Sequence, residues 1–129
     1  MKKILIADDH IIVRLGVSTA IKETIKAVEI VHAQTYDEVF AQLKATNFDL
    51  LLLDINMPGG NNIKVIRELL DIQPDLKILV FSSYDETLYA LRYIEAGAAG
   101  YVNKTTSMTE FTNAINSIFR TWPLYVRSN

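Results

Sequence analysis

Cysteine is absent from this chain of 129 residues, and histidine occurs only at His10 and His32. The lack of thiols excludes disulfides, thiolate zinc sites and cysteine nucleophiles. Two histidines leave few donors for a zinc centre or a histidine-based triad. The chemistry that remains is that of oxygen-bearing side chains.

Glycine and proline are also scarce, with five and three residues, while 50% of the chain is apolar and 22% is charged. This is the composition of a packed globular protein and not of a linker or a disordered tail. No apolar run approaches the roughly 20 residues that cross a bilayer. Asp8 and Asp9 interrupt the apolar start of the chain before a signal-peptide core could form. We therefore expect a cytoplasmic protein with one core and no membrane partner.

Neither sign of charge dominates. Thirteen basic and fifteen acidic residues give a net charge of -2, and the basic residues form no stripe along the chain. A protein that binds nucleic acid normally carries a stripe or patch of basic residues. This segment alone is therefore not expected to bind DNA or RNA.

Five short apolar runs alternate with segments of helical periodicity. The runs predicted to be strands are residues 3–7, 29–33, 49–53, 77–81 and 100–102. The helices between them are marked by Val13, Val17, Ala20 and Ile21; Val39, Phe40 and Leu43; Ile63, Ile66, Leu69 and Leu70; Leu88, Leu91 and Ile94; and Phe111, Ile115, Ile118 and Phe119. Residues 50–53 and 78–81 are apolar at every position, which is typical of strands covered on both faces. The alternation predicts an α/β fold, a doubly wound five-stranded parallel sheet with helices on both faces.

Ligands of such sheets bind beyond the carboxyl ends of the strands. The segments that follow the predicted strands there are Asp8-Asp9-His10, Asp54-Ile55-Asn56-Met57-Pro58-Gly59, Ser82-Ser83 and Asn103-Lys104. Each has a simpler explanation when taken alone: Asp9 as a helix cap, residues 54–59 as a turn, Ser82 as a cap or turn residue and Lys104 as a solvated charge. We expect His10 at the surface and His32 away from the cluster, and assign neither a role.

The convergence of these residues argues against the simpler explanations. Three carboxylates at one sheet edge repel one another unless positive charge neutralises them, as a divalent cation and an ammonium would. An open, oxygen-only site suits Mg²⁺, or Mn²⁺ in its place. Lys104 and Ser82 could then contact phosphoryl oxygens. Asp54, at the end of the most apolar strand, is the best candidate for a nucleophile that forms an acyl phosphate.

The combined pattern resembles the receiver domain of two-component response regulators over about residues 1–120. The motifs that carry the resemblance are Asp8-Asp9-His10, Asp54 with Met57-Pro58-Gly59-Gly60, Ser82-Ser83, Glu95 to Val102 including Tyr101, and Lys104. They are similar in particular to the NarL/FixJ subfamily. The resemblance implies a flavodoxin-like sheet of strand order 2-1-3-4-5.

The resemblance also implies roles for individual residues. Asp54 would accept a phosphoryl group from the phosphohistidine of a sensor histidine kinase. Asp8 and Asp9 would hold Mg²⁺ together with Asp54 and the backbone carbonyl of Asn56. Lys104 would pair with the phosphoryl group, and Ser82 and Tyr101 would form a switch in which Tyr101 turns inward from the surface. The domain would be a phosphoacceptor and not an enzyme acting on other substrates.

Three features depart from the family pattern. The switch hydroxyl is Ser82 where many relatives carry threonine, and Thr105 follows Lys104 where many have proline. NarL-type proteins continue into a helix-turn-helix domain that this chain does not contain, so control of transcription and contact with DNA would require that missing domain. Residues 121–129 are either a C-terminal extension or the start of an interdomain linker. A homodimer is an option that the sequence leaves open.

Other functions on this fold fit the residues less well. A phosphohydrolase with an aspartyl-phosphate intermediate needs a general acid just after its nucleophile, but Ile55 and Asn56 follow Asp54. A flavin-binding module needs a hydroxyl- and glycine-rich loop where Asp8 and Asp9 would repel phosphate. An interaction domain that is never phosphorylated would not need the full acidic site and the lysine.

The fourth predicted helix is apolar and aromatic around more of its circumference than one buried stripe requires. The residues concerned are Leu88, Tyr89, Ala90, Leu91, Tyr93 and Ile94. Either this helix presents a docking surface, or Tyr89 and Tyr93 pack their rings and keep their hydroxyls in water.

Overall fold

A computed structural model describes residues 1–58, 63–83, 87–120 and 124–126, with residues 87, 88 and 124–126 described by their backbone. Strands and helices alternate along the chain. The strands are β1 (Lys2–Ala7), β2 (Val28–Ala33), β3 (Leu50–Asp54), β4 (Lys77–Ser82), β5 (Gly100–Asn103) and β6 (Leu124–Val126). The helices are α1 (Ile11–Thr24), α2 (Tyr36–Ala45), α3 (Lys64–Ile72), α4 (Thr87–Glu95) and α5 (Met108–Ile118). Residues 59–60 of the glycine-containing turn and residues 121–123 and 127–129 of the tail lie outside the described residues.

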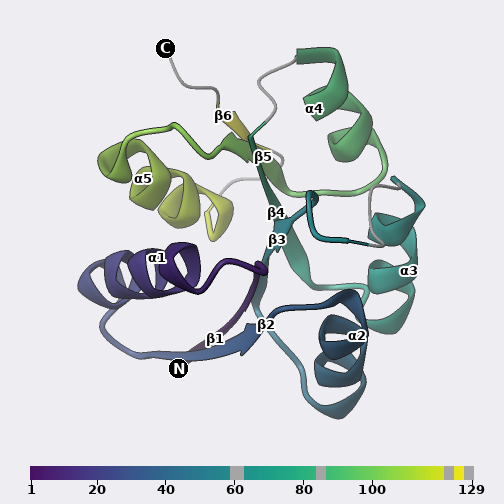
Figure 1. Cartoon of the computed structure of the whole chain (residues 1–129), viewed down its shortest axis with the longest axis horizontal. Helices are drawn as coiled ribbons and strands as arrows, with labels where there is room; N and C mark the ends of the chain where they lie inside the picture. Colours follow the sequence, from purple (N-terminus) through teal and green to yellow (C-terminus); the bar gives the residue numbers. More distant parts are fainter. Residues whose placement is uncertain (59–62, 84–86, 121–123, 127–129) are drawn as a thin grey trace.

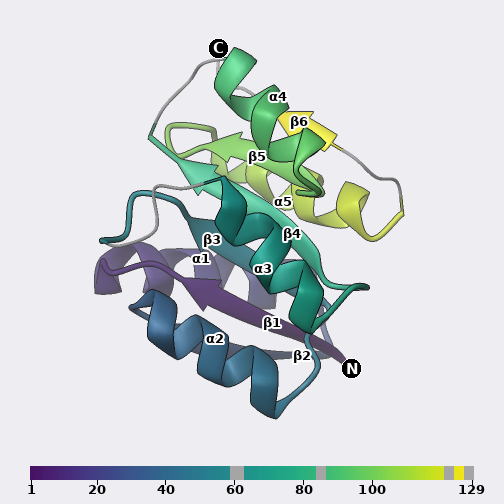
Figure 2. The same ribbon diagram turned by 90° about the vertical axis from the view of Figure 1, so that its right-hand side faces the viewer.

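The strands form one parallel sheet in the order β2-β1-β3-β4-β5-β6. Figure 1 shows α1 and α5 on one face of this sheet and α2, α3 and α4 on the other, and Figure 2 looks onto the second face. The predicted doubly wound fold and the strand order 2-1-3-4-5 are confirmed. The sixth strand was not predicted. It pairs with β5 in the register Gly100↔Leu124, Tyr101↔Tyr125 and Val102↔Val126.

The central strands explain why the sequence folds this way. Every residue of β3 is buried. Leu51 and Leu53 belong to the core under α2, α3 and α4, while Leu50 and Leu52 belong to the core under α1 and α5. A strand with helices on both faces has no side that tolerates polar residues, hence its uninterrupted apolar run.

The ends of the helices position the loops at the carboxyl edge. His10 is the N-cap residue of α1, so the interpretation of Asp9 as the helix cap is wrong. Gly97, two residues after the end of α4, has a φ of 120°. A β-carbon there would lie 2.6 Å from Cδ1 of Leu70 on α3, so both the backbone conformation and the packing favour glycine. Within the described residues, no helix has the length and apolarity to cross a membrane.

Candidate functional site

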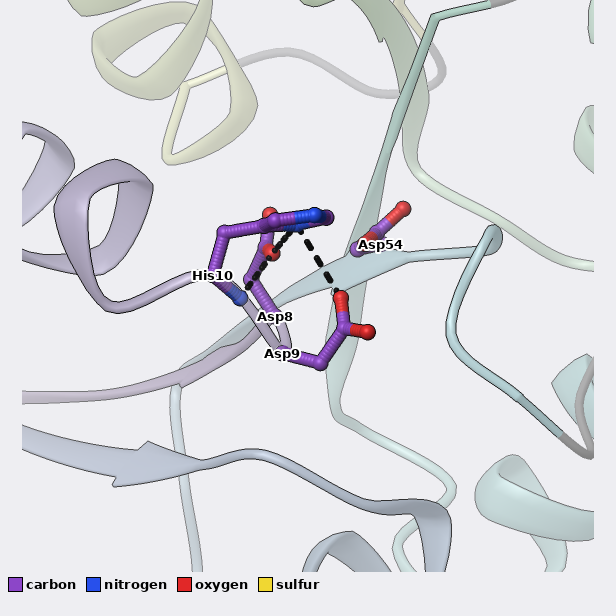
Figure 3. A group of neighbouring side chains, drawn as sticks. All are labelled: Asp8, Asp9, His10 and Asp54. Atoms are coloured by element: carbon purple, nitrogen blue, oxygen red, sulfur yellow. Dashed lines mark hydrogen bonds and ion pairs between the residues drawn. The ribbon is translucent and has the colours of Figure 1, made fainter.

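Three carboxylates meet where β1 and β3 end. These strands are neighbours in register, with Ala7 opposite Leu53, so the residues that complete each strand, Asp8 and Asp54, come side by side. Both are buried, whereas Asp9 is exposed. Oxygen atoms of all three carboxylates and a ring nitrogen of His10 lie within 4.8 Å of one another. Figure 3 shows these four side chains grouped at the ends of the two strands. The structure therefore brings together the acidic residues that the sequence predicted.

Lys104, which follows the last residue of β5, supplies positive charge to this cluster. Its Nζ lies 3.1 Å from Oδ2 of Asp8 and 3.3 Å from Oδ2 of Asp54. The backbone N–H of Lys104 donates to the carbonyl of Ser82, with an N···O distance of 2.7 Å, which ties the lysine to the end of β4. Only 18% of its side chain is exposed. Lys104 is therefore a partly buried ion-pair partner and not a solvated charge.

Each of the two buried carboxylates is oriented by its own loop. Oδ1 of Asp8 accepts from the backbone N–H of His10, and Oδ1 of Asp54 accepts from the backbone N–H of Asn56, both at 2.8 Å. Such bonds to an N–H two residues on are typical of Asx turns. The Oδ2 atoms make no hydrogen bond to any described residue, and both face the Lys104 ammonium. One oxygen of each carboxylate is thus oriented by a backbone N–H, and the other faces the lysine.

Electrostatics make Asp54 unusual among the acidic residues. Burial raises the pKa of its carboxyl, and the charge of Asp8 adds to this, while the Asn56 N–H and the Lys104 ammonium oppose it. The Tyr36 hydroxyl donates to the backbone carbonyl of Asp54 at 3.3 Å, and burial together with the Asp54 charge raises the pKa of Tyr36. A cation beside Asp54 would favour the ionised form that a nucleophile requires.

Sequence comparisons agree with this geometry. A family model described as the response regulator receiver domain matches residues 4–116. The chain belongs to that family. Response regulator GacA of Pseudomonas aeruginosa is 32% identical over 120 residues, which are 92% of this chain and 56% of that protein. The DNA-binding transcriptional activator DevR/DosR of Mycobacterium tuberculosis is 33% identical over 118 residues, 92% of this chain and 54% of that protein. This receiver domain thus spans about half the length of these curated relatives.

Solved structures resemble the receiver domain throughout. A two-component response regulator of the LuxR family from Aurantimonas sp. SI85-9A1 is 29% identical, with a TM-score of 0.86 over 95% of this chain and 87% of that one. A CheY-like receiver domain protein from Methanospirillum hungatei JF-1 shares the fold, with a TM-score of 0.81 at 21% identity over 93% of this chain and 95% of that one. These matches confirm the flavodoxin-like architecture and the resemblance to NarL/FixJ-type regulators.

The acidic cluster of the receiver domain fits a divalent cation. The two buried Oδ2 atoms lack hydrogen bonds from described residues, and the exposed Asp9 leaves one side of the cluster open. Carboxylate oxygens around an open site are the ligands that Mg²⁺ prefers, because it keeps several waters. Receiver domains in general bind Mg²⁺ at an acidic pocket of this kind.

The position of Tyr101 differs from the expectation. Tyr101 is 1% exposed and does not start at the surface, so the predicted inward turn is wrong for this structure. Its ring centroid lies 6.4 Å from that of Tyr89 and 6.3 Å from that of Tyr93, both on α4. The two α4 rings are in edge contact at 5.3 Å. The physical reason is that α4 carries two aromatic side chains that close over β5.

The same cluster bears on the two interpretations of α4. Tyr93 is buried and Tyr89 is half-buried, so both rings pack against the domain and do not line an open surface. Burial raises the pKa of Tyr93, and the Tyr89 hydroxyl contributes to the shift. Leu91, at 44% exposure, is the apolar α4 side chain that the structure places in solvent among residues 89–95. Ring packing explains most of the aromatic character of this helix.

Sequence reasoning missed three contacts of the site. His10, expected to have no role, places Nδ1 2.9 Å from Oδ1 of Asp8 and 3.1 Å from Oδ1 of Asp9. The Arg14 guanidinium donates to the Asp8 carbonyl at 2.6 Å, and Oδ1 of Asn56 accepts from the Ser83 hydroxyl at 3.3 Å. The sequence did carry a signal for the Arg14 contact. Arg14 is four residues after His10, so it lies on the same face of α1 as the loop that contains Asp8. His32 lies in β2 next to Ala33, whose carbonyl accepts from the Asp8 N–H at 3.1 Å, and it is not among the residues that form the acidic cluster.

Proposed function

We propose that Asp54 accepts a phosphoryl group from the phosphohistidine of a sensor histidine kinase. The observation that supports this most is the Oδ2 atom of Asp54, which is buried, makes no hydrogen bond to a described residue and lies 3.3 Å from the Lys104 ammonium. In the proposed step an ionised oxygen of Asp54 attacks phosphorus, and an O–P bond forms. The P–N bond to the kinase imidazole breaks, and its electron pair returns to the ring.

In this proposal the residues around Asp54 and a bound cation together neutralise the negative charge of the carboxylates and the phosphoryl group. Asp8, Asp9, Asp54 and the backbone carbonyl of Asn56 would hold Mg²⁺ or Mn²⁺. When bound, that cation neutralises negative charge on the carboxylates and on the phosphoryl oxygens. Lys104 offers an ammonium to a phosphoryl oxygen, and Ser82 offers a hydroxyl to another. The orientation of Asp54 by the Asn56 N–H leaves its other oxygen directed into the cluster.

The residues after Asp54 support a signalling role over hydrolysis. Ile55 is buried and apolar, and Asn56 uses its side chain to accept from Ser83. Neither can act as a general acid on the acyl phosphate. We therefore infer that catalysis by this domain is limited to its own phosphorylation and slow dephosphorylation, so that the phosphorylated state lasts long enough to carry a signal.

An exposed apolar surface supports docking of the kinase. Ile11, Ile12 and Leu15, on the first turns of α1, have exposures of 59%, 77% and 53%. They lie on the N-terminal half of α1, the helix that His10 of the acidic cluster precedes as its N-cap. A kinase helix that carries the phosphohistidine would bury this surface while it presents phosphorus to Asp54. Homodimerisation stays a prediction.

The output of the whole protein is also a proposal. One relative is named as a DNA-binding transcriptional activator, and this chain spans 54% of its length. We propose that a DNA-binding helix-turn-helix domain outside this chain controls transcription when the receiver domain is phosphorylated. The scattered basic residues of this chain support the assignment of DNA contact to another domain.

Removal of Mg²⁺ by a chelator tests whether phosphorylation of this domain depends on the metal. Incubated with Mg²⁺ and a small phosphodonor such as acetyl phosphate, the chain is expected to gain one phosphoryl group, measured as intact mass. Addition of EDTA should reduce uptake to near zero, because Asp8, Asp9 and Asp54 then repel the incoming phosphoryl oxygens. Equal uptake with and without the chelator would contradict a metal-dependent phosphoacceptor.

We propose that Ser82 and Lys104 together couple phosphorylation to the α4–β5 face. Driving a two-state equilibrium from 1:99 to 99:1 takes about 5.5 kcal/mol, whereas one hydrogen bond to a charged group contributes about 1.5–3 kcal/mol. Ser82 alone is therefore too weak. Since Tyr101 is already packed under Tyr89 and Tyr93, phosphorylation would stabilise this arrangement and not bring the ring in from solvent.

A pair of hydroxyl variants tests this coupling. The Ser82→Ala variant should still be phosphorylated, but should lose most of the phosphorylation-dependent amide protection in α4 and β5, measured by hydrogen exchange. The control is Thr19→Ala, at an exposed hydroxyl on α1 that bonds the Leu15 carbonyl of its own helix, which should respond like the wild type. A full response in Ser82→Ala would show that phosphorylation is transmitted without the Ser82 hydroxyl.

A further inference from the structure

His10 contacts two carboxylates of the proposed cation site at once. Its Nδ1 lies 2.9 Å from Oδ1 of Asp8 and 3.1 Å from Oδ1 of Asp9. Figure 3 shows the imidazole ring beside the carboxylates of Asp8 and Asp9, with Asp54 close by. One ring nitrogen therefore faces oxygen atoms of two carboxylates of the proposed cation site.

The distances match those between neighbouring ligands of one cation. In an octahedral shell with metal–ligand bonds of about 2.0–2.1 Å, adjacent ligand atoms are about 3 Å apart. The two Nδ1···O distances fit that edge, and the four candidate ligand atoms fall within 4.8 Å of one another. The buried Oδ2 atoms of Asp8 and Asp54 have the Lys104 ammonium as their counter-charge, so one lysine faces three carboxylates and the cluster has room for further positive charge.

We propose that Nδ1 of His10 is a direct ligand of the divalent cation and biases the site towards first-row transition metals over Mg²⁺. The ring would coordinate as the neutral tautomer with its proton on Nε2. Imidazole favours transition-metal ions, whereas carboxylates, carbonyls and water suit Mg²⁺. A cluster of oxygen donors alone would show a weaker preference for transition metals.

The ring has the freedom that such a role requires. The His10 side chain is 64% exposed, so it can rotate by a small amount to meet a cation without disturbing the core. Its backbone, in contrast, is fixed, because the His10 N–H donates to Oδ1 of Asp8 and its carbonyl accepts from the N–H of Arg14 at the start of α1. The side chain is therefore mobile on an anchored backbone.

This inference rests on the proposed function, in which the cluster holds a divalent cation. Pulsed electron paramagnetic resonance of bound Mn²⁺ tests the presence of the cation and its ligation by His10 separately. Untagged wild-type protein with one equivalent of Mn²⁺ should show ¹⁴N modulation from the remote imidazole nitrogen. The His10→Gln variant should bind Mn²⁺ without it. The matched control is His32→Gln, which removes the only other histidine and should keep the modulation.

Each alternative result is decisive. Mn²⁺ bound to wild-type protein without ¹⁴N modulation would overturn the role of His10 and leave the proposed cation site standing. Modulation that persists in His10→Gln would place the nitrogen elsewhere and also overturn it. Failure of wild-type protein to bind Mn²⁺ at all would overturn both the inference and the cation site.

Calorimetric titration tests the selectivity. His10→Gln should weaken Ni²⁺ binding by at least about tenfold, because even loss of a residue that only orients a ligand costs about 10- to 100-fold in metal affinity. Its affinity for Mg²⁺ should change far less. Asp9→Asn, which removes an oxygen ligand, should weaken both ions. Equal weakening of Ni²⁺ and Mg²⁺ by His10→Gln would overturn the proposed bias.

Discussion

The Asp54→Asn variant is expected to take up no phosphoryl group from a small phosphodonor while it keeps its fold. The amide is nearly isosteric with the carboxylate but is a poor nucleophile. Its oxygen can still accept from the Asn56 N–H, and its neutral charge removes the repulsion with Asp8 that raises the pKa of Asp54. Intact mass measures the uptake, and circular dichroism verifies the fold.

The control for this variant is Asp71→Asn, at an exposed carboxylate on α3. It removes the same charge far from the cluster and should be phosphorylated like the wild type. Stoichiometric labelling of Asp54→Asn under the same conditions would reject Asp54 as the acceptor.

The Lys104→Met variant is expected to lose up to about 3–5 kcal/mol of unfolding free energy at neutral pH, because it leaves buried carboxylates without their cation. The Oδ2 atoms of Asp8 and Asp54 both face the ammonium, and the two side chains are 2% and 0% exposed. Methionine keeps the apolar stem of the lysine. Urea unfolding monitored by tryptophan fluorescence or circular dichroism measures the loss.

The loss should depend on pH in a defined direction. The pKa of Asp54 is already raised in the folded protein, and removal of Lys104 takes away one of the effects that lower it. A raised folded-state pKa costs nothing below the ordinary aspartate pKa of about 4, where both states are protonated. The cost grows as pH rises from about 4 to the folded-state pKa and stays constant above it. The stability deficit of Lys104→Met should therefore shrink on acidification and also on addition of Mg²⁺.

An exposed lysine provides the comparison. Lys26, in the connection between α1 and β2, is exposed, and Lys26→Met should change stability by less than about 1 kcal/mol at every pH. A deficit of Lys104→Met that is equally small, or that does not vary with pH, would contradict the view that Lys104 compensates buried charge.

The parallel sheet was predictable because its central strands are uninterrupted apolar runs in the sequence. Leu50–Leu53 are apolar without interruption since helices cover both faces, and the alternation with helical segments leaves few other topologies. β6 could not be predicted in this way. Its three residues are too few for any periodicity, and they follow Pro123, which commonly marks the end of ordered structure after a helix.

The acidic site was predictable to the extent that strand order determines it. Asp8 and Asp54 meet because β1 and β3 are neighbours in register. Contacts that depend on side-chain direction were not predictable. The ring of His10 turns back over the loop, and Tyr101 is covered by Tyr89 and Tyr93, whose rings reach across from another element. Such packing is set by three-dimensional fit and leaves no signal in local sequence.

Direct localisation of the phosphoryl group tests the central claim. Wild-type protein phosphorylated with Mg²⁺ and acetyl phosphate would be treated with borohydride, which reduces an aspartyl phosphate to homoserine, and then digested and sequenced by tandem mass spectrometry. We expect homoserine at position 54 and unmodified aspartate at positions 8 and 9. Homoserine at either of those positions with Asp54 unmodified would contradict the assignment of nucleophile and cation ligands.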